Sequence, residues 1–224
     1  MGEVAEAYAG CRARIAELAG ALDRQGAATP VPACPGWSVH DVVAHVSGVV
    51  DDALAGRLDG VATDPWTAAQ VEARRDRSVA DILAEWEEQA PAFEGLLDAI
   101  GDPGRQAVAD VATHEHDVRG ALGAPGARDS DAVRIGLAFF APRMVEVAAE
   151  RGIVLRVQAG DGLEWGPDDA PTTVTAGPFD LFRALSGRRS AEQLLALRWS
   201  GDAEAALGAF TYGPFRPAEQ PLAE

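Results

Sequence analysis

Long segments with helical periodicity dominate the first two-thirds of the chain. Apolar residues recur at three- and four-residue spacing, so each segment has one face that neighbouring segments must cover. Short loops rich in Gly and Pro separate most of them, which favours antiparallel neighbours. We therefore expect an up-and-down helix bundle. The segments are residues 3–24, 38–56, 79–100, 105–122 and 131–152.

Capping signals support two of these helix starts. Ser38 is followed three residues later by Asp41, and Ser78 by Asp81, a variant of the capping box that opens many helices. Pro91 lies inside the third segment, where it is expected to kink or interrupt the helix.

The pattern changes beyond about residue 152. Alternating and β-branched runs, separated by turns, predict strands, and two short helices follow. These elements are expected at residues 153–160, 163–166, 172–177, 179–187 and 190–199. The sequence thus predicts a mainly α protein, with a helix bundle over residues 1–152 and a small α+β domain over residues 153–224.

Charge and cysteine content exclude several classes of protein. The formal net charge of -16 over 224 residues argues against binding to nucleic acid or to an anionic membrane. Cys11 and Cys34 do not form a C-x-x-C pair, which favours free thiols in a reducing compartment, and neither receives a role. With no signal-like segment and no long apolar run, we expect a cytoplasmic protein, monomeric or homodimeric.

The stretch DVATHEHDVRGAL holds two of the four histidines of the chain. Asp110, His114 and Asp117 follow i, i+4, i+7 spacing and share a helix face with small apolar residues, so this face is expected to point inward. His116 lies about 200° round the helix from His114 and is expected to be exposed. Glu115 also lies on a different face and is left out of the candidate site.

A third histidine, His45, has apolar residues on its own face of the second helix, whereas His40 in the first turn is expected to face solvent. Facing helices of a bundle can bring His45 against Asp110 and His114. Two imidazoles and one carboxylate leave a fourth position open, as in a catalytic zinc site. Buried histidines also serve as ordinary hydrogen-bonded core residues, so spacing alone leaves both interpretations open.

Several motifs together resemble the mycothiol-dependent maleylpyruvate isomerase family. They are TPVPACPGWSVHDVVAHVSG, the QVEARRDRS stretch, the Asp110-x-x-x-His114-x-x-Asp117 element that runs into the HEHDVRGALG block, and a C-terminal module that contains LSGRRS and SGDAEA. The resemblance implies a DinB-like, metal-binding four-helix bundle followed by a small C-terminal α+β domain.

The resemblance also implies site residues. His45, Asp110 and His114 match the positions that hold a divalent metal in the family, usually zinc, with Asp110 in place of the family's Glu. Asp117 would orient a ligand or handle a proton, and Arg188 of LSGRRS would steer an anionic substrate.

The implied activity is that of a divalent-metal-dependent isomerase or thiol transferase. It would use mycothiol as thiol cosubstrate and act on a small electrophilic, anionic substrate. Two alternatives stay open: a metal-dependent hydrolase on the same bundle, which needs no thiol, and a non-catalytic module that binds a metal or ligand.

Overall fold

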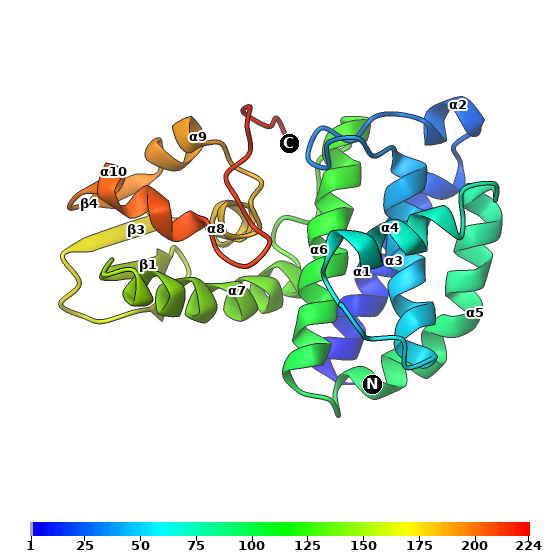
Figure 1. Ribbon diagram of the computed structural model, residues 1–224, viewed down its shortest axis with the longest axis horizontal. Coiled ribbons are helices and arrows are strands. Elements are labelled where there is room, and N and C mark those ends of the chain that lie inside the picture. The colour runs from blue at the N-terminus through cyan, green and yellow to red at the C-terminus, as the bar shows by residue number, and fades with distance from the viewer. Residues whose placement is uncertain (1) are drawn as a thin grey trace. The chain divides into compact units, whose positions relative to one another are not determined.

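Residues 2–224 are described by a computed structural model, which is mainly helical with one small sheet (Figure 1). This confirms the predicted fold class. The chain divides into two compact units, one ending at Gly126 and the other covering Ala127–Ala223.

The earlier unit is a four-helix bundle. Its elements are α1 (Glu3–Gly20), α2 (Arg24–Ala27), α3 (Val39–Leu54), α4 (Asp64–Glu72), α5 (Val79–Leu97) and α6 (Asp102–Leu122). Helices α1 and α3 each pack against both α5 and α6, which closes the ring of four, and α4 packs across α3 (Figure 1). No helix among residues 2–224 is long and apolar enough to cross a membrane.

Local signals explain the helix boundaries. The Ser38 hydroxyl accepts the Asp41 N–H (3.3 Å) and the Asp41 carboxylate accepts the Ser38 N–H (2.9 Å), as the capping box predicts. Helix α6 begins three residues earlier than predicted, because Pro103 is tolerated in its first turn. It ends at Gly123, whose φ of 63° is left-handed. Contrary to the expected interruption, α5 runs as one helix through Pro91.

Aromatic side chains from α1 and α5 form part of the bundle core. Tyr8 and Trp86 are 2% and 0% exposed, and the Trp86 indole N–H donates to the Tyr8 hydroxyl (3.2 Å). Phe93 packs edge-on against Tyr8 with ring centroids 5.1 Å apart. Burial raises the pKa of Tyr8 far above its ordinary value. The phenol is therefore a neutral hydrogen-bonding member of the core.

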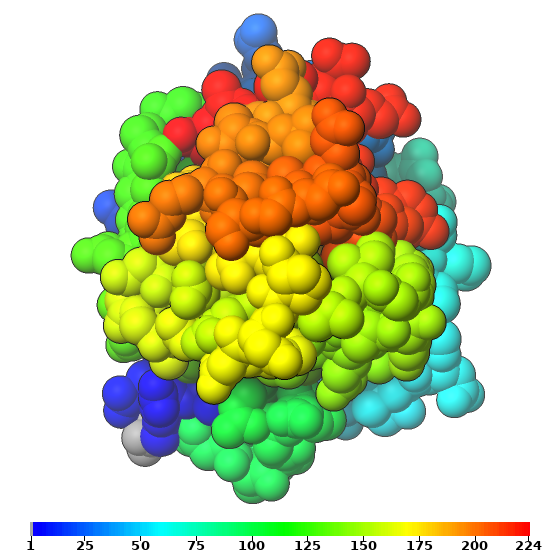
Figure 2. All heavy atoms as spheres, turned by 90° about the vertical axis from the view of Figure 1, so that its left-hand side faces the viewer, coloured from blue at the N-terminus to red at the C-terminus, as the bar shows by residue number. Residues whose placement is uncertain are grey.

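The later unit is a small α+β fold. Its elements are α7 (Asp131–Glu150), β1 (Leu155–Ala159), β2 (Glu164–Trp165), β3 (Thr172–Ala176), α8 (Pro178–Leu185), α9 (Ala191–Leu195), β4 (Arg198–Ser200), α10 (Ala203–Ala206) and a 3-10 turn at Leu207–Phe210. The sheet has the order β2-β1-β3-β4, with β1 and β3 parallel and the outer pairs antiparallel. Strand β4 lies largely within residues 190–199, where the sequence pattern predicted a helix. Helix α10 (orange) contacts β3 (yellow), as the surface in Figure 2 shows.

Helix α7 belongs to this later unit, although the sequence placed it in the bundle. It packs against α8 and β1. A Cβ at Gly136 would lie 2.4 Å from the Phe182 ring, so the glycine lets α8 approach closely. The division between the compact units therefore falls at residues 126 and 127, whereas the sequence predicted residue 152.

Asp98, just past the end of α5, ties that end to the start of α1. We expect Asp98→Asn to lower the Tm at neutral pH. The Asp98 carboxylate accepts hydrogen bonds from the backbone N–H groups of Gly2 (2.6 Å), Ala5 and Val4. These bonds, that of Gly2 above all, hold the pKa of Asp98 below its ordinary value. The carboxylate therefore stabilises the fold above the ordinary pKa of about 4, and this contribution is lost as pH falls through the lower folded-state value.

Thermal unfolding of both proteins from about pH 7 to about pH 2.5 checks this expectation. The difference in Tm between the wild type and Asp98→Asn should shrink toward zero at the acid end of the pH range. A difference that stays constant would contradict the assigned role of the carboxylate.

Candidate metal centre

Two histidines from different helices of the bundle face each other. His45 on α3 and His114 on α6 are 3% and 7% exposed, and their ring centroids lie 4.9 Å apart. Asp110, one turn before His114, completes the group: its Oδ2 is 3.6 Å from His45 Nε2, and its Oδ1 is 3.7 Å from His114 Nε2. The structure thus brings together the three residues that the sequence singled out as metal ligands.

The chemistry of this group fits a divalent metal. One donor atom from each of His45, Asp110 and His114 lies within 4.8 Å of the others. Two imidazoles and one carboxylate are a donor set found in catalytic zinc sites with an open position. The Asp110 side chain is 37% exposed, so the group is reachable from solvent.

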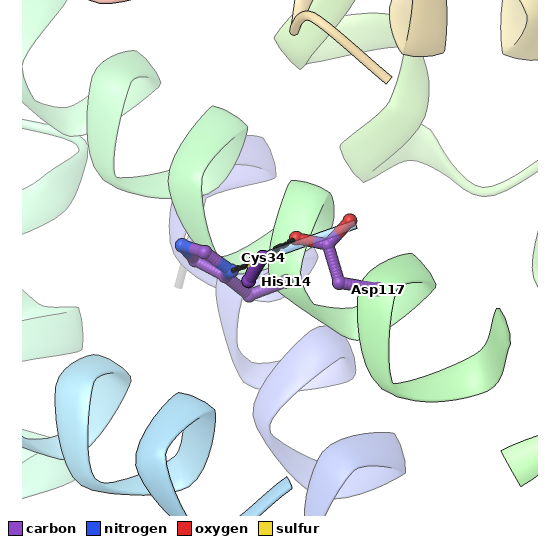
Figure 3. Close-up of side chains that lie close together, drawn as sticks. All are labelled: Cys34, His114 and Asp117. Atoms are coloured by element: carbon purple, nitrogen blue, oxygen red, sulfur yellow. Dashed lines mark hydrogen bonds and ion pairs between the residues drawn. The ribbon is translucent and has the colours of Figure 1, made fainter. Parts of the chain in front are cut away.

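A second polar group lies on the Nδ1 side of the His114 ring. It includes Cys34, to which the sequence assigned no role. His114 Nδ1 is 3.0 Å from Oδ2 of Asp117, which is 1% exposed. The Cys34 thiol donates to the same oxygen (3.2 Å) and lies 3.9 Å from His114 Nδ1 (Figure 3). Cys34, His114 and Asp117 form a second set with metal-ligand geometry, on the opposite ring nitrogen of His114.

Trp37 covers both histidine rings. Its ring stacks on His114 at 6.1 Å and meets His45 edge-on at 5.3 Å. It sits in the loop that carries Cys34, which folds back through a hydrogen bond from the Val31 N–H to the Trp37 carbonyl (2.8 Å). Trp37 also lines a surface cavity of about 620 Å³ with residues of α4 and with Arg75, which lies beyond the end of that helix. Trp37 therefore packs against the two histidines and also lines this cavity.

His45 has a buried partner that no spacing rule pointed to. Gln70 on α4 is 3% exposed, and its Oε1 lies 2.7 Å from His45 Nδ1. Trp66, on the same helix, meets the His45 ring edge-on at 6.5 Å. The stretch QVEARRDRS, which begins at Gln70, is part of the family resemblance, but the resemblance assigned neither Gln70 nor Trp66 a role in the site.

The expectation that His116 is exposed is wrong. His116 is 3% exposed, because α6 is buried on every face between Val111 and Val118 rather than along one stripe. His40, expected to face solvent, is half-buried, with Nε2 2.8 Å from the Arg77 carbonyl.

Glu115 points away from the candidate ligands, as its helix face predicted. It is 0% exposed and accepts two hydrogen bonds from Arg14 (both 2.7 Å) and one from Arg119 (2.8 Å). Burial disfavours its charged form, but the bonds from Arg14 and Arg119 outweigh burial and hold the pKa of Glu115 below its ordinary value. Glu115 is therefore a buried ion-pair partner that anchors α1 to α6.

Arg188 lies in the later unit, just beyond α8. Its Nη1 donates to the Ser186 carbonyl (2.7 Å). The neighbouring Arg189 is buried, and its Nη2 is 3.3 Å from Asp180 Oδ1. A role for Arg188 toward an anionic substrate stays a prediction.

Comparisons with known proteins find similarity in sequence and in fold. The family model described as the mycothiol maleylpyruvate isomerase N-terminal domain matches residues 8–124, nearly the whole earlier unit. Two crystal structures of the mycothiol-dependent maleylpyruvate isomerase, one a histidine-to-alanine mutant, have TM-scores of 0.53 and 0.59 to this chain. Both are 11% identical to it over 83% of this chain and 88% of the other, so they show a shared fold. No curated protein matches the sequence.

We expect Glu115→Gln to lower the free energy of unfolding by about 2–4 kcal/mol, because it leaves two half-buried guanidinium groups without the buried counter-charge that they share. Glu87→Gln is the matched control: Glu87 also pairs with an arginine, Arg12, but is 72% exposed. That change should cost at most about 0.5 kcal/mol. Chemical denaturation of both variants measures the difference, and equal losses would contradict a special contribution from Glu115.

Proposed function

Because the chain belongs to the mycothiol maleylpyruvate isomerase N-terminal domain family, we propose that it is a divalent-metal-dependent enzyme that uses mycothiol. The proposed reaction is isomerisation of a small electrophilic, anionic substrate, or transfer of the thiol to it. The convergence of His45, Asp110 and His114 carries the proposal, since these residues gather donor atoms at one place in the matched domain.

His45, Asp110 and His114 are the proposed ligands, and zinc is the proposed ion. When bound, a divalent ion of this kind favours the thiolate form of a coordinated thiol at neutral pH. The exposed side of Asp110 gives small molecules a route to the group. Asp is one methylene shorter than the Glu of the family pattern. Here its two oxygens already lie 3.6 and 3.7 Å from the two imidazole Nε2 atoms.

Asp117 is proposed as a positioning residue for His114. Its carboxylate can only accept, so the contact at 3.0 Å places the proton of a neutral His114 ring on Nδ1 and leaves the lone pair on Nε2. Trp37 covers one side of both rings and keeps them in place. Arg188 is proposed to attract the anionic group of the substrate through its charge.

Metal content is the first measurement that tests the proposal. Elemental mass spectrometry of tag-free protein is expected to find about one metal ion per chain, and His114→Ala should lose it. His40→Ala is the matched control, because His40 lies on α3 but contacts the Arg77 carbonyl instead of the group. Wild-type protein that stays metal-free after zinc is added back would contradict the metal centre.

Thiol dependence is the second measurement. Turnover of maleylpyruvate or another anionic electrophile should require mycothiol, and Asp117→Asn should reduce it about 10- to 100-fold. Hydrolysis without any thiol would instead favour a metal-dependent hydrolase. Metal binding without turnover of any candidate substrate would favour a non-catalytic binding module.

A further inference from the structure

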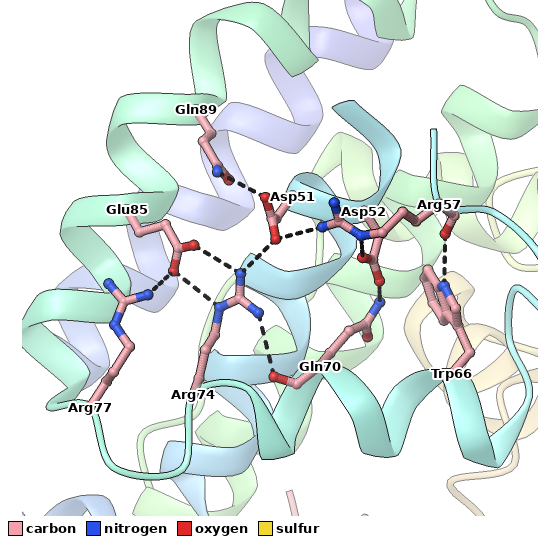
Figure 4. A network of polar contacts seen from close by, with 9 residues as sticks. All are labelled: Asp51, Asp52, Arg57, Trp66, Gln70, Arg74, Arg77, Glu85 and Gln89. Atoms are coloured by element: carbon pink, nitrogen blue, oxygen red, sulfur yellow. Dashed lines mark hydrogen bonds and ion pairs between the residues drawn. The ribbon is translucent and has the colours of Figure 1, made fainter. Parts of the chain in front are cut away.

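A chain of hydrogen bonds runs from the surface of the bundle to His45. The Arg57 Nε–H donates to Asp52 Oδ1 (2.8 Å), and the Gln70 Nε2–H donates to Asp52 Oδ2 (2.7 Å). Figure 4 shows the Gln70 amide reaching Asp52 from α4. On its other side, Gln70 Oε1 lies 2.7 Å from His45 Nδ1.

Each link of this chain allows only one orientation of the next. A carboxylate accepts and cannot donate, so Asp52 selects the amide orientation that turns Gln70 Nε2 toward it. The Gln70 carbonyl oxygen then faces His45 Nδ1. A carbonyl oxygen also only accepts, so the proton of a neutral His45 ring must lie on Nδ1, and Nε2 carries the lone pair.

We propose that Gln70 and Asp52 are positioning residues that fix His45 in the tautomer whose Nε2 lone pair faces Asp110 and His114. This inference rests on the proposed metal centre, because a metal ligand needs that lone pair. Asp117 holds His114 from behind in the same way, so each imidazole of the group has its own acceptor-only partner.

The packing around Gln70 supports a positioning role. A Cβ at Gly48 on α3 would lie 2.6 Å from Gln70 Cβ, so the glycine lets α4 come close enough for the amide to reach His45. Arg74, one turn after Gln70, is 4% exposed and donates from Nε and Nη2 to Glu85 on α5 (3.0 and 2.9 Å). The segment that carries the amide is therefore fixed against α3 at Gly48 and against α5 through Arg74.

The tautomer of His45 can be measured directly on the metal-free, full-length protein. Long-range ¹H–¹⁵N correlation spectra distinguish the two neutral forms of an imidazole ring. With the ring neutral, the wild type should show His45 with its proton on Nδ1. Gln70→Met, of similar length but without an acceptor, should give a mixture of both tautomers. Gln89→Met is the matched control, because Gln89 contacts Asp51 of the same network but not His45, and it should leave the tautomer unchanged.

A double variant that exchanges the amide and the carboxylate tests whether the wild-type tautomer of His45 can be restored. In Asp52→Asn the Gln70 amide is no longer held in one orientation, so the tautomers should mix. In the double variant Gln70→Glu with Asp52→Asn, the new carboxylate accepts from Asn and from His45 Nδ1, which should restore the wild-type tautomer. Zn²⁺ affinity should fall about 10- to 100-fold in Gln70→Met and recover in the double variant.

The outcomes separate the two proposals. A wild-type ring with its proton on Nε2, or a tautomer that does not respond to Gln70→Met, would overturn the positioning role even if Zn²⁺ binds. The expected tautomer changes without Zn²⁺ binding in any protein would support the positioning of His45 and contradict the metal centre.

Discussion

Five consecutive polar side chains on α6, from Thr113 to Asp117, are buried. A buried polar group without a partner costs about 1–3 kcal/mol, so the contacts that these side chains make contribute to the stability of the bundle. The Thr113 hydroxyl donates back to the Ala109 carbonyl (2.7 Å), Glu115 binds arginines from α1 and α6, and His114 contacts Asp117. The Glu115–Arg14 pair joins α6 to α1, and it therefore helps to fix the position of the helix that carries His114.

Much of the fold could be predicted from local signals in the sequence. Serine caps and apolar spacing located the starts of α3 and α5, and alternation located β1 and β3. The same reasoning put His45, Asp110 and His114 on inward faces, and the structure places their donor atoms within 4.8 Å. Helical spacing could bring them together because two of the three lie one turn apart on one helix, and the third lies on a helix that packs against it. Their assignment as metal ligands came from the family resemblance.

Contacts between distant segments could not be predicted in this way. Gln70 is 25 residues from His45 along the chain, and Cys34 is 80 residues from His114. Both come from a short helix or a loop whose path depends on tertiary packing. His116 was misplaced because periodicity assumes one buried face, and it cannot show that a helix is covered all round. The position of α7 was missed for a related reason, since an apolar face does not tell which neighbour covers it.

The partial exposure of Asp110 has a consequence for how the centre would be supplied with metal. The two imidazoles are almost fully enclosed, whereas the acidic side chain between them remains 37% open to water. An ion held there could enter and leave without unfolding of the bundle. Its identity would then follow the relative abundance of divalent ions in the surroundings, and not the ion present when the chain first folded. Chelators and competing metals would then reach the site in the folded protein.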